Sequence, residues 1–290
     1  MIPVTEYRPR RSVLYMPSSN ARALEKATTL PCDGIIFDLE DAVAPDAKVE
    51  ARAAACAAVQ SGRYGRRELV IRVNAADTPW HSDDLAAAAA AAPDAILVPK
   101  VNSADEVLAL VSAMEAAGAP EKTKLWAMIE TPAAILGIAS LAAASPRLEV
   151  FVMGSNDLVK ELRAEHVPGR APILTAMSLA VLGVRAAGKV ILDAVYNDVR
   201  DLEGFREEAV QARQFGFDGK SLVHPGQVGP ANEVFAPDPD ALEDARGVIE
   251  AWEAGAGSGV VTYKGRMVEG LHVEIARDTL AMHEAIVALG

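Results

Sequence analysis

The chain has 290 residues, of which 51% are hydrophobic, and it carries a formal net charge of −12. This length suits one (β/α)8 barrel with a short extension, and the apolar fraction can fill a large core without disulfides. A strongly acidic chain lacks the basic field that binds phosphate backbones, so we expect no nucleic-acid partner.

The sequence also argues against a secreted or membrane-bound protein. Cys32 and Cys56 could pair, but two free thiols in an intracellular protein are the simpler interpretation. Arg8, Arg10 and Arg11 are not followed by an apolar run of signal-peptide length. No stretch approaches the ~18 apolar residues of a membrane span. We therefore expect a cytoplasmic protein with no membrane partner.

Eight short apolar segments recur along the chain, separated by segments with helical periodicity such as Ala104–Ala117 and Thr131–Ala144. The predicted strands are Ser12–Met16, Gly34–Leu39, Leu69–Val73, Ala95–Val98, Leu125–Ile129, Val150–Met153, Val190–Leu192 and Gly219–Val223. Most are continuous apolar runs, which are typical of parallel strands buried on both faces. Eight strand–helix units predict an α/β fold, a (β/α)8 TIM barrel.

The residues after about 235 exceed what eight such units require. They are interpreted as a connector, a helix, a flexible break, a hairpin-like piece and a final helix, at Asn232–Pro239, Asp240–Ala254, Gly255–Gly259, Val260–Glu269 and His272–Leu289. We predict a catalytic barrel domain over residues 1–235 and a C-terminal extension over residues 236–290. The extension is expected to act as a lid, or as an arm that packs on a neighbouring subunit.

Polar residues follow the predicted strands, at the end where barrel enzymes place their active sites. These strand ends carry Pro17–Asn20, Asp38–Asp41, Arg72, Asn74, Lys100, Glu130, Gly154–Asp157, Asp193 and His224. Carboxylates gathered at one rim raise one another's pKa unless a cation lies among them. Oxygen ligands without a thiolate favour Mg²⁺, or Mn²⁺, over zinc. We choose Glu130 and Asp157 as metal ligands; the alternative is that they cap the following helices, with Asp157 a candidate N-cap.

Arg72 lies within an apolar strand, where an unpaired charge is costly. One interpretation is a buried salt bridge to Glu40 or Asp38. The other is a fixed cation for a developing enolate or a substrate carboxylate, and both can hold together. Lys100 is either a solvent-exposed lysine of the rim or a ligand contact, and His224 is either a cap of the strand end or a site residue.

Several motifs occur in a characteristic order: Arg11–Pro17, Asp38–Pro45 followed by Lys48 and Arg52, Ile71–Asn74, Val98–Val101, Ile129–Thr131, Gly154–Leu158, Gly219–Gln227 and Tyr263–Glu269. Singly each motif is weak. Together they resemble the HpcH/HpaI aldolase and citrate lyase β-subunit superfamily over nearly the whole chain, most closely its malyl-CoA and citramalyl-CoA lyase branch.

The resemblance implies a Mg²⁺-dependent carbon–carbon lyase that cleaves a 3-hydroxyacyl-CoA to an acyl-CoA and a small 2-oxo acid, glyoxylate or pyruvate, in a reversible Claisen-type reaction. It implies that Glu130 and Asp157 bind the metal, that Arg72 stabilises the thioester enolate oxygen, and that a homotrimer or homohexamer forms. It further implies that Asp38 and Glu40 lie near metal-bound water, and that Glu269, from the tail of a neighbouring subunit, moves a proton. The residues implied to contact CoA or the substrate are Tyr15, Pro17, Lys26, Gly154, Ser155 and Asn156.

Three positions depart from the family pattern. The glycine usual after the first-strand proline is Ser18, a CoA-contacting arginine aligns with Asn20, and the tail aspartate is replaced by Glu269. Glutamate is one methylene longer than aspartate, and a shift of a catalytic group by about 1 Å can cost on the order of 10²-fold in rate. Glu269 therefore makes a thioesterase an alternative, one that hydrolyses malyl-CoA without breaking a carbon–carbon bond. Two further alternatives are a metal-dependent aldolase that acts without CoA and a citrate lyase subunit that acts on an acyl carrier protein.

Overall fold

The structure, a computed structural model, describes residues 7–255 and 259–289. It divides into two compact units. Of the described residues, Arg10–Phe235 form the first unit, and those of 236–289 together with Tyr7–Pro9 form the second. Among the described residues, no helix is both long and apolar enough to cross a membrane.

The first unit is built on a closed barrel of parallel strands. These strands are β1 (Ser12–Pro17), β2 (Gly34–Asp38), β3 (Glu68–Arg72), β4 (Ala95–Val98), β5 (Lys124–Ile129), β6 (Leu148–Met153), β7 (Val190–Asp193) and β8 (Gly219–Leu222). Each strand pairs with the next, and Val13 of β1 pairs with Ser221 of β8 to close the ring. The TIM-barrel prediction is confirmed.

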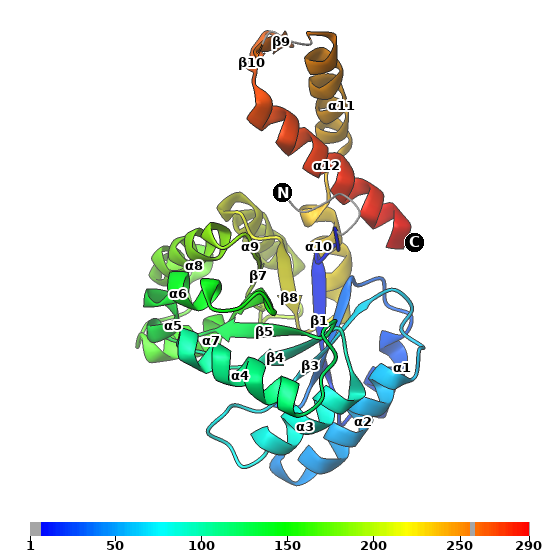
Figure 1. The fold of residues 1–290 in the computed structure, drawn as a ribbon, viewed down its shortest axis with the longest axis vertical. Coiled ribbons are helices and arrows are strands. Elements are labelled where there is room, and N and C mark those ends of the chain that lie inside the picture. Colours follow the sequence, from blue (N-terminus) through cyan, green and yellow to red (C-terminus); the bar gives the residue numbers. More distant parts are fainter. Residues whose placement is uncertain (1–6, 256–258, 290) are drawn as a thin grey trace. The chain divides into compact units, whose positions relative to one another are not determined.

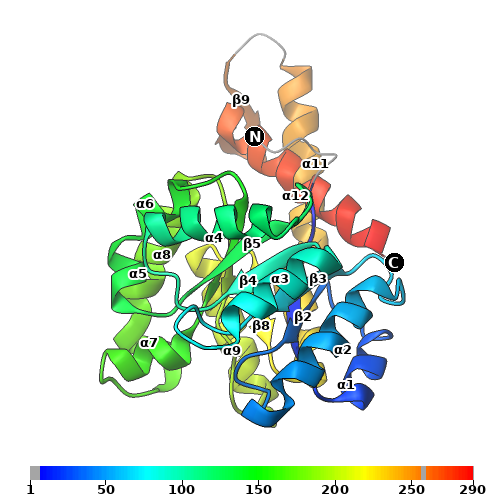
Figure 2. The ribbon, with the colours of Figure 1, turned by 60° about the horizontal axis from the view of Figure 1, so that its bottom comes forward.

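Helices follow the strands and surround the barrel, as Figure 1 and Figure 2 show. The α-helices of this unit are α1 (Ala21–Ala27), α2 (Lys48–Gln60), α3 (His81–Ala91), α4 (Ala104–Ala116), α5 (Pro132–Leu136), α6 (Ile138–Ala143), α7 (Ser155–Glu161), α8 (Leu174–Ala186), α9 (Leu202–Phe215) and α10 (Val228–Phe235). Short 3-10 helices η2 (Pro45–Ala47), η3 (Pro168–Ile173) and η4 (Pro225–Gln227) lie in the connections. The helix predicted as continuous over Thr131–Ala144 is divided at Gly137, between α5 and α6.

The barrel interior is polar at the carboxyl ends of the strands and apolar in the layer next to that end. Its buried layer is formed by Val13, Ile36, Val70, Ala95, Leu97, Trp126, Met128, Val150, Val152 and Leu192. Because side chains alternate between the two faces of a strand, residues two positions after Val13, Ile36 and Val70 face inward as well. Those residues are Tyr15, Asp38 and Arg72, so three of the predicted site residues reach the interior at one end of the barrel.

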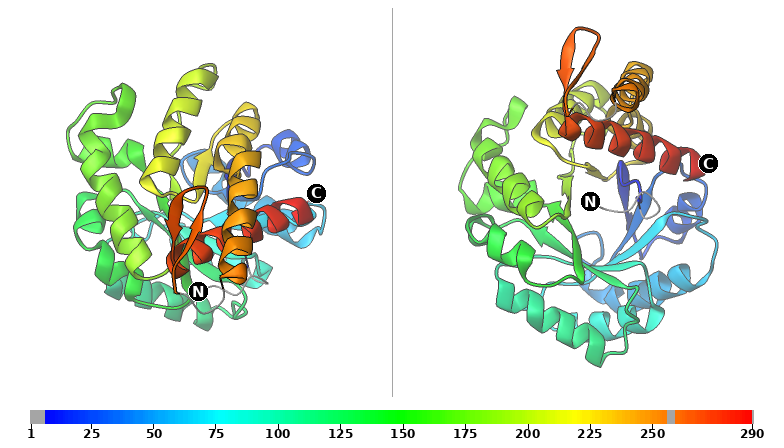
Figure 3. Two further views of the ribbon diagram at one scale, coloured as in Figure 1. Left: turned by 90° about the horizontal axis from the view of Figure 1, so that it is seen from above. Right: turned by 45° about the horizontal axis from the view of Figure 1, so that its top comes forward.

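The second unit contains two helices and a hairpin: α11 (Pro239–Ala254), β9 (Val261–Tyr263), β10 (Arg266–Val268) and α12 (Gly270–Leu289). In Figure 3 they are the orange and red segments. Their core is formed by Ala245, Val248, Val268, Val273 and Ala276. The predicted helix, hairpin and final helix are confirmed, but residues 256–258 of the predicted flexible break lie outside the described residues.

The connector predicted at Asn232–Pro239 is wrong in its first half. Helix α10 runs to Phe235, and only the residues after it are non-helical before α11 begins. Ala231, Val234 and Phe235 are buried in the main hydrophobic core, so packing extends the helix past the point where the two prolines suggested a break.

Candidate active site

Arg72 ends β3 inside the barrel and is enclosed by acids. Its Nε and Nη2 atoms donate to the two carboxylate oxygens of Asp38 at 2.6 and 2.7 Å. Its Nη1 atom lies 2.8 Å from Oε2 of Glu40, and its guanidinium lies 4.7 Å from the centre of the Tyr15 ring. The salt bridge that the sequence offered as one interpretation of Arg72 is therefore present, and it includes both Asp38 and Glu40.

One edge of this guanidinium keeps donor capacity. Nη1 makes one short contact, to Glu40; its next neighbours are Oδ2 of Asp41 at 3.5 Å and the sulfur of Met128 at 3.7 Å. Thioether sulfur is a weak acceptor, and 3.5 Å is a long separation for a hydrogen bond. A substrate oxygen that enters the barrel mouth could therefore accept a hydrogen bond from Nη1 without displacing Asp38.

The two carboxylates that contact Arg72, those of Asp38 and Glu40, have pKa values shifted in opposite directions. Burial alone would raise the pKa of Asp38, but the bidentate contact with Arg72 outweighs burial and holds this pKa below its ordinary value. Burial raises the pKa of Glu40 to about 8 despite Arg72, and the charges of Asp41 and Glu130 add to the rise. Asp38 is thus a permanent anion, whereas Glu40 can hold or release a proton near neutral pH.

Glu130 follows β5 and is 3% exposed. Its Oε1 accepts a hydrogen bond of 2.8 Å from the backbone amide of Lys100, a residue held in the left-handed region at φ 54°. Burial raises the pKa of Glu130 to about 7, with the charge of Asp157 as the next largest cause. The two acids that we predicted as metal ligands are therefore close enough for one charge to affect the other.

Asp157 lies in the first turn of α7, but it does not cap this helix. The N-cap of α7 is Gly154, and no side chain makes a capping hydrogen bond there. The alternative that Asp157 is an N-cap is therefore wrong. Asp157 is half-buried, and its charge also helps to raise the pKa of the exposed Lys100.

Gly154 leaves the space that Glu130 occupies. A Cβ atom built on Gly154 would lie 2.4 Å from Oε2 and 2.5 Å from Cβ of Glu130. Both distances are far below van der Waals contact, so any larger residue at this position would displace the carboxylate. Glycine at the start of α7 is thus required by the side chain that ends β5.

These carboxylates fit a magnesium ion. Burial and then the charge of Asp157 raise the pKa of Glu130, and a divalent ion bound by both carboxylates would offset their repulsion. Within residues 7–255 and 259–289, no three His, Cys, Asp or Glu side chains form a group that could hold a metal. Mg²⁺ often takes only one or two protein carboxylates and fills its other positions with water and substrate. Glu130 and Asp157 could hold such an ion.

The other predicted contacts lie on several different elements. Pro17 ends β1, Lys26 lies exposed in the last turn of α1, and Ser155 is buried at the start of α7. Asn156 is exposed and exchanges side-chain hydrogen bonds with Asn197 at 3.3 and 2.8 Å. Glu269 belongs to the second unit, where its backbone amide donates to Nδ1 of His272 at 3.1 Å.

Two strand-end residues serve the fold. Asp193 ends β7 but faces outward, where Lys220 and Arg170 bind it at 2.6 and 2.8 Å. The side-chain alternation that turns Leu192 inward turns Asp193 out. The His224 ring accepts a hydrogen bond from the amide of Gly226, so His224 caps the start of the 3-10 helix η4 and not, as predicted, the end of the strand.

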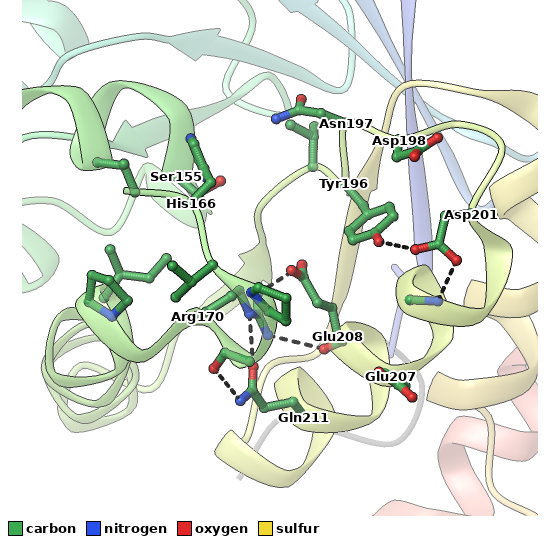
Figure 4. Close-up of a pocket in the computed structure, with 18 of the residues that line it drawn as sticks. Ser155, His166, Arg170, Tyr196, Asn197, Asp198, Asp201, Glu207, Glu208 and Gln211 are labelled. Carbon is green, nitrogen blue, oxygen red and sulfur yellow. Dashed lines mark hydrogen bonds and ion pairs between the residues drawn. The ribbon is translucent and has the colours of Figure 1, made fainter. Parts of the chain in front are cut away.

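A cavity of about 720 Å³ lies beside this site, between α7, η3 and α9. It includes Ser155 in its wall but none of Asp38, Arg72, Glu130 or Asp157. Figure 4 shows its wall, with hydrogen bonds joining Arg170 to Gln211 and Tyr196 to Asp201. Its acidic residues are Glu165, Asp198, Asp201, Glu203, Glu207 and Glu208. An acidic cavity repels phosphate groups, so it is a poor place for the phosphates of a CoA thioester.

Comparison with known proteins identifies what this chain is similar to. The model of the family described as HpcH/HpaI aldolase/citrate lyase matches residues 11–225. A (3S)-malyl-CoA thioesterase of Cereibacter sphaeroides is 47% identical over 97% of both chains. Citrate lyase subunit beta of Escherichia coli is 37% identical over 96% of this chain and 94% of its own.

Solved structures show the same similarity. The protein CitE from Mycobacterium tuberculosis, in complex with magnesium, acetoacetate and coenzyme A, is 29% identical with a TM-score of 0.76. The match covers 94% of this chain and 97% of that chain. The resemblance therefore extends over both units.

Proposed function

Because this chain belongs to the HpcH/HpaI aldolase/citrate lyase family, whose members include carbon–carbon lyases, we propose that it is an enzyme acting on a malyl-CoA-type 3-hydroxyacyl-CoA thioester. The observation that supports this substrate is the 47% identity with a (3S)-malyl-CoA thioesterase over 97% of both chains. The same relative makes hydrolysis of the thioester the first candidate reaction, with malate and free CoA as products.

Arg72 supplies the electrophilic group in this proposal. Its Nη1 atom, which has only one short contact, would donate to the thioester carbonyl oxygen as negative charge develops there. Asp38 fixes the guanidinium by its other edge, so Arg72 needs no reorganisation during the reaction. Glu40, on the same Nη1 atom, would hold or move the proton of the attacking water.

Glu130 and Asp157 are proposed to hold Mg²⁺, with Mn²⁺ as a possible substitute. Magnesium is present in the similar CitE structure, which supports this assignment. When bound, the ion would polarise the hydroxyl and carboxylate oxygens of the substrate as a Lewis acid. The chain's own contribution is to orient the two carboxylates, through the Lys100 amide for Glu130 and through helix α7 for Asp157. Tyr15, Pro17, Lys26 and residues 154–156 remain the proposed CoA and substrate contacts.

Carbon–carbon cleavage is the second candidate reaction, favoured by the family and by the 37% identity with citrate lyase subunit beta. In this reaction a carboxylate of the site would take the proton of the carbinol hydroxyl, the C–O bond would become the carbonyl of the oxo acid, and the bond between the carbinol carbon and the acyl α-carbon would break. Arg72 would then stabilise the enolate oxygen of the departing acyl-CoA, and glyoxylate or pyruvate would leave.

Glu269 is the proposed acid that moves the proton at the acyl α-carbon, and we propose that it comes from the extension of a neighbouring subunit in a trimer or hexamer. In this proposal residues 1–235 form the catalytic domain and residues 236–290 the arm that completes a neighbour's site. If hydrolysis is the only reaction, Glu269 becomes dispensable for turnover, because no α-carbon is protonated.

Product identity distinguishes the reactions. The protein is incubated with Mg²⁺ and malyl-CoA or citramalyl-CoA, and products are resolved by mass. From malyl-CoA, malate with free CoA indicates hydrolysis, whereas acetyl-CoA with glyoxylate indicates lysis; from citramalyl-CoA, the corresponding products are citramalate with free CoA and acetyl-CoA with pyruvate. Cleavage of free 4-hydroxy-2-oxo acids instead would indicate a CoA-independent aldolase, and activity only on an acyl carrier protein would indicate a citrate lyase subunit.

A further inference from the structure

A buried lysine outside the proposed catalytic set lies directly behind Glu40. Lys48 begins α2 and is 5% exposed. Its Nζ atom donates to the backbone carbonyls of Leu39 and Glu40 and to Oδ1 of Asn74, each at 2.7 Å. An ammonium group has three donors, so these three oxygens account for all of them.

These bonds join the two strands that carry the guanidinium and its acids. Leu39 and Glu40 directly follow β2, which ends in Asp38, and Asn74 lies two residues after Arg72 at the end of β3. Asn74 is fixed in turn, because its Nδ2 atom donates to the Leu39 carbonyl at 3.0 Å and to Asp84 at 2.6 Å. The Lys48 ammonium therefore ties the backbone of Glu40 to the segment that follows Arg72.

We propose that Lys48 is a positioning residue that sets the Glu40 carboxylate against Nη1 of Arg72. Burying an ammonium group is costly, and its three acceptors are uncharged carbonyl oxygens, so only the charges of nearby carboxylates, those of Asp38, Glu40 and Asp84 foremost, act against this cost. In this proposal the Lys48 ammonium fixes the orientation of the loop after β2, because it binds the carbonyls of Leu39 and Glu40. A rotation of that loop would carry the Glu40 carboxylate away from Arg72, although Asp38 would still hold the guanidinium by its other edge.

The importance of this contact for turnover rests on the proposed function, whereas the geometric effect of Lys48 does not. The test compares Lys48→Met with Lys48→Arg and with Lys189→Met. Lys189 is a matched control, because its Nζ atom also donates to two backbone carbonyls, those of Ser145 and Leu148, but Leu148 begins β6 at the opposite end of the barrel.

Lys48→Met is expected to lower kcat on malyl-CoA by about 10- to 100-fold while KM changes less than about threefold, since misplacement by about 1 Å can cost 10²-fold. Lys48→Arg, which keeps a charged donor, is expected to recover part of that loss. Lys189→Met is expected to lower the melting temperature to a similar extent and to leave kcat unchanged.

Crystal structures of the wild type and Lys48→Met supply a readout that is independent of substrate. The Nη1–Oε2 contact between Arg72 and Glu40, 2.8 Å here, is expected to be lost in the variant. If that contact persists, or if kcat matches that of Lys189→Met, the proposal is overturned. A wild-type protein inactive on every CoA thioester would refute the proposed function, while the crystal structures would still decide the role of Lys48. Should Lys48→Met not fold, Lys48→Gln replaces it with the same readouts.

Discussion

Asp38 holds one edge of the Arg72 guanidinium through two hydrogen bonds, with Nε–Oδ1 at 2.6 Å and Nη2–Oδ2 at 2.7 Å, and both residues are almost fully buried. Two parallel bonds fix the plane of the guanidinium as well as its position. Asp38 occupies Nε and Nη2, and the remaining nitrogen, Nη1, faces Glu40. A cation held in this way can act on a substrate without moving.

Replacing Asp38 by alanine should therefore reduce both stability and activity. Removing one partner of a buried ion pair typically costs about 3–5 kcal/mol, because the remaining charge is left buried and unpaired. Urea unfolding at pH 7 measures this loss. Glu115→Ala is the control, since this exposed acid pairs with Arg147 in water-screened surroundings and should change the free energy of unfolding little. Equal losses in the two variants would contradict the account.

Glu130→Gln and Asp157→Asn should each weaken Mg²⁺ binding. Changes in residues that merely support metal ligands commonly cost 10- to 100-fold in affinity, so loss of a ligand charge should cost at least about that much. Isothermal titration calorimetry with Mg²⁺ alone gives the affinity without any assay of turnover. Glu115→Gln should bind Mg²⁺ as the wild type does, and an unchanged affinity in both site variants would refute the metal assignment.

Gly154→Ala should impair the same site through packing. The added methyl would lie 2.4 Å from Oε2 of Glu130, so the carboxylate must shift and metal affinity should fall by about tenfold or more. Gly229→Ala in α10 is the control, because a Cβ atom built there would meet nothing within 4 Å. That control should bind Mg²⁺ normally. A Gly154→Ala protein with wild-type affinity and an unmoved Glu130 would contradict this explanation.

The ion network around Asp193 should make stability fall in acid. Burial alone would raise the pKa of Asp193, but Lys220 and Arg170 outweigh it and depress this pKa below the ordinary value. The unfolded chain, with an aspartate pKa of about 3.9, then binds more protons than the folded chain in acid. This contribution is present above about pH 4 and is lost as the pH falls through the folded pKa.

Asp193→Asn should therefore be much less stable than the wild type at pH 7, and the difference should shrink below about pH 4. Denaturant unfolding at several values of pH between 7 and 3 measures it. Asp105→Asn, which alters an exposed acid on α4, should follow the wild-type curve. A gap between Asp193→Asn and wild type that stays constant over this range would contradict the depressed pKa.

Glu269 offers a test of the neighbouring-subunit proposal. Arg72→Ala and Glu269→Gln should each be inactive in carbon–carbon cleavage, because one lacks the cation and the other the proton-moving acid. If the arm completes a neighbour's site, mixing and reassembling the two variants should restore part of the activity, since some sites would then combine an intact Arg72 with an intact Glu269. Mixed oligomers that stay inactive would exclude completion between subunits.

Much of the fold could be predicted because its signals are local. The apolar run at Ala95–Val98 gave β4 with its observed bounds, and the charge of Arg72 within such a run pointed to a buried partner. The sequence left Glu40 and Asp38 open as partners of Arg72, and the structure shows contacts with both, with Asp38 opposite Arg72 on the neighbouring strand. The outward direction of Asp193 could have been found from the alternation after the inward-facing Leu192.

Other features depend on contacts between distant segments. The Lys48 side chain reaches back to Leu39 and Glu40 and across to Asn74, which no local pattern in the sequence indicates. The end of α10 at Phe235 depends on packing against the core, and the two prolines that follow suggested an earlier stop. The need for glycine at Gly154 likewise comes from Glu130, on another strand.

The most direct test of the account is a mass-resolved time course with Mg²⁺ and (3S)-malyl-CoA, run in parallel for the wild type and for Arg72→Lys. The wild type should consume the thioester only when metal is present, and release malate with CoA, or acetyl-CoA with glyoxylate. Arg72→Lys keeps the charge but loses the planar fork and should be slower by about 100-fold or more. A wild type that leaves malyl-CoA intact, or an equally active Arg72→Lys, would contradict the central claim.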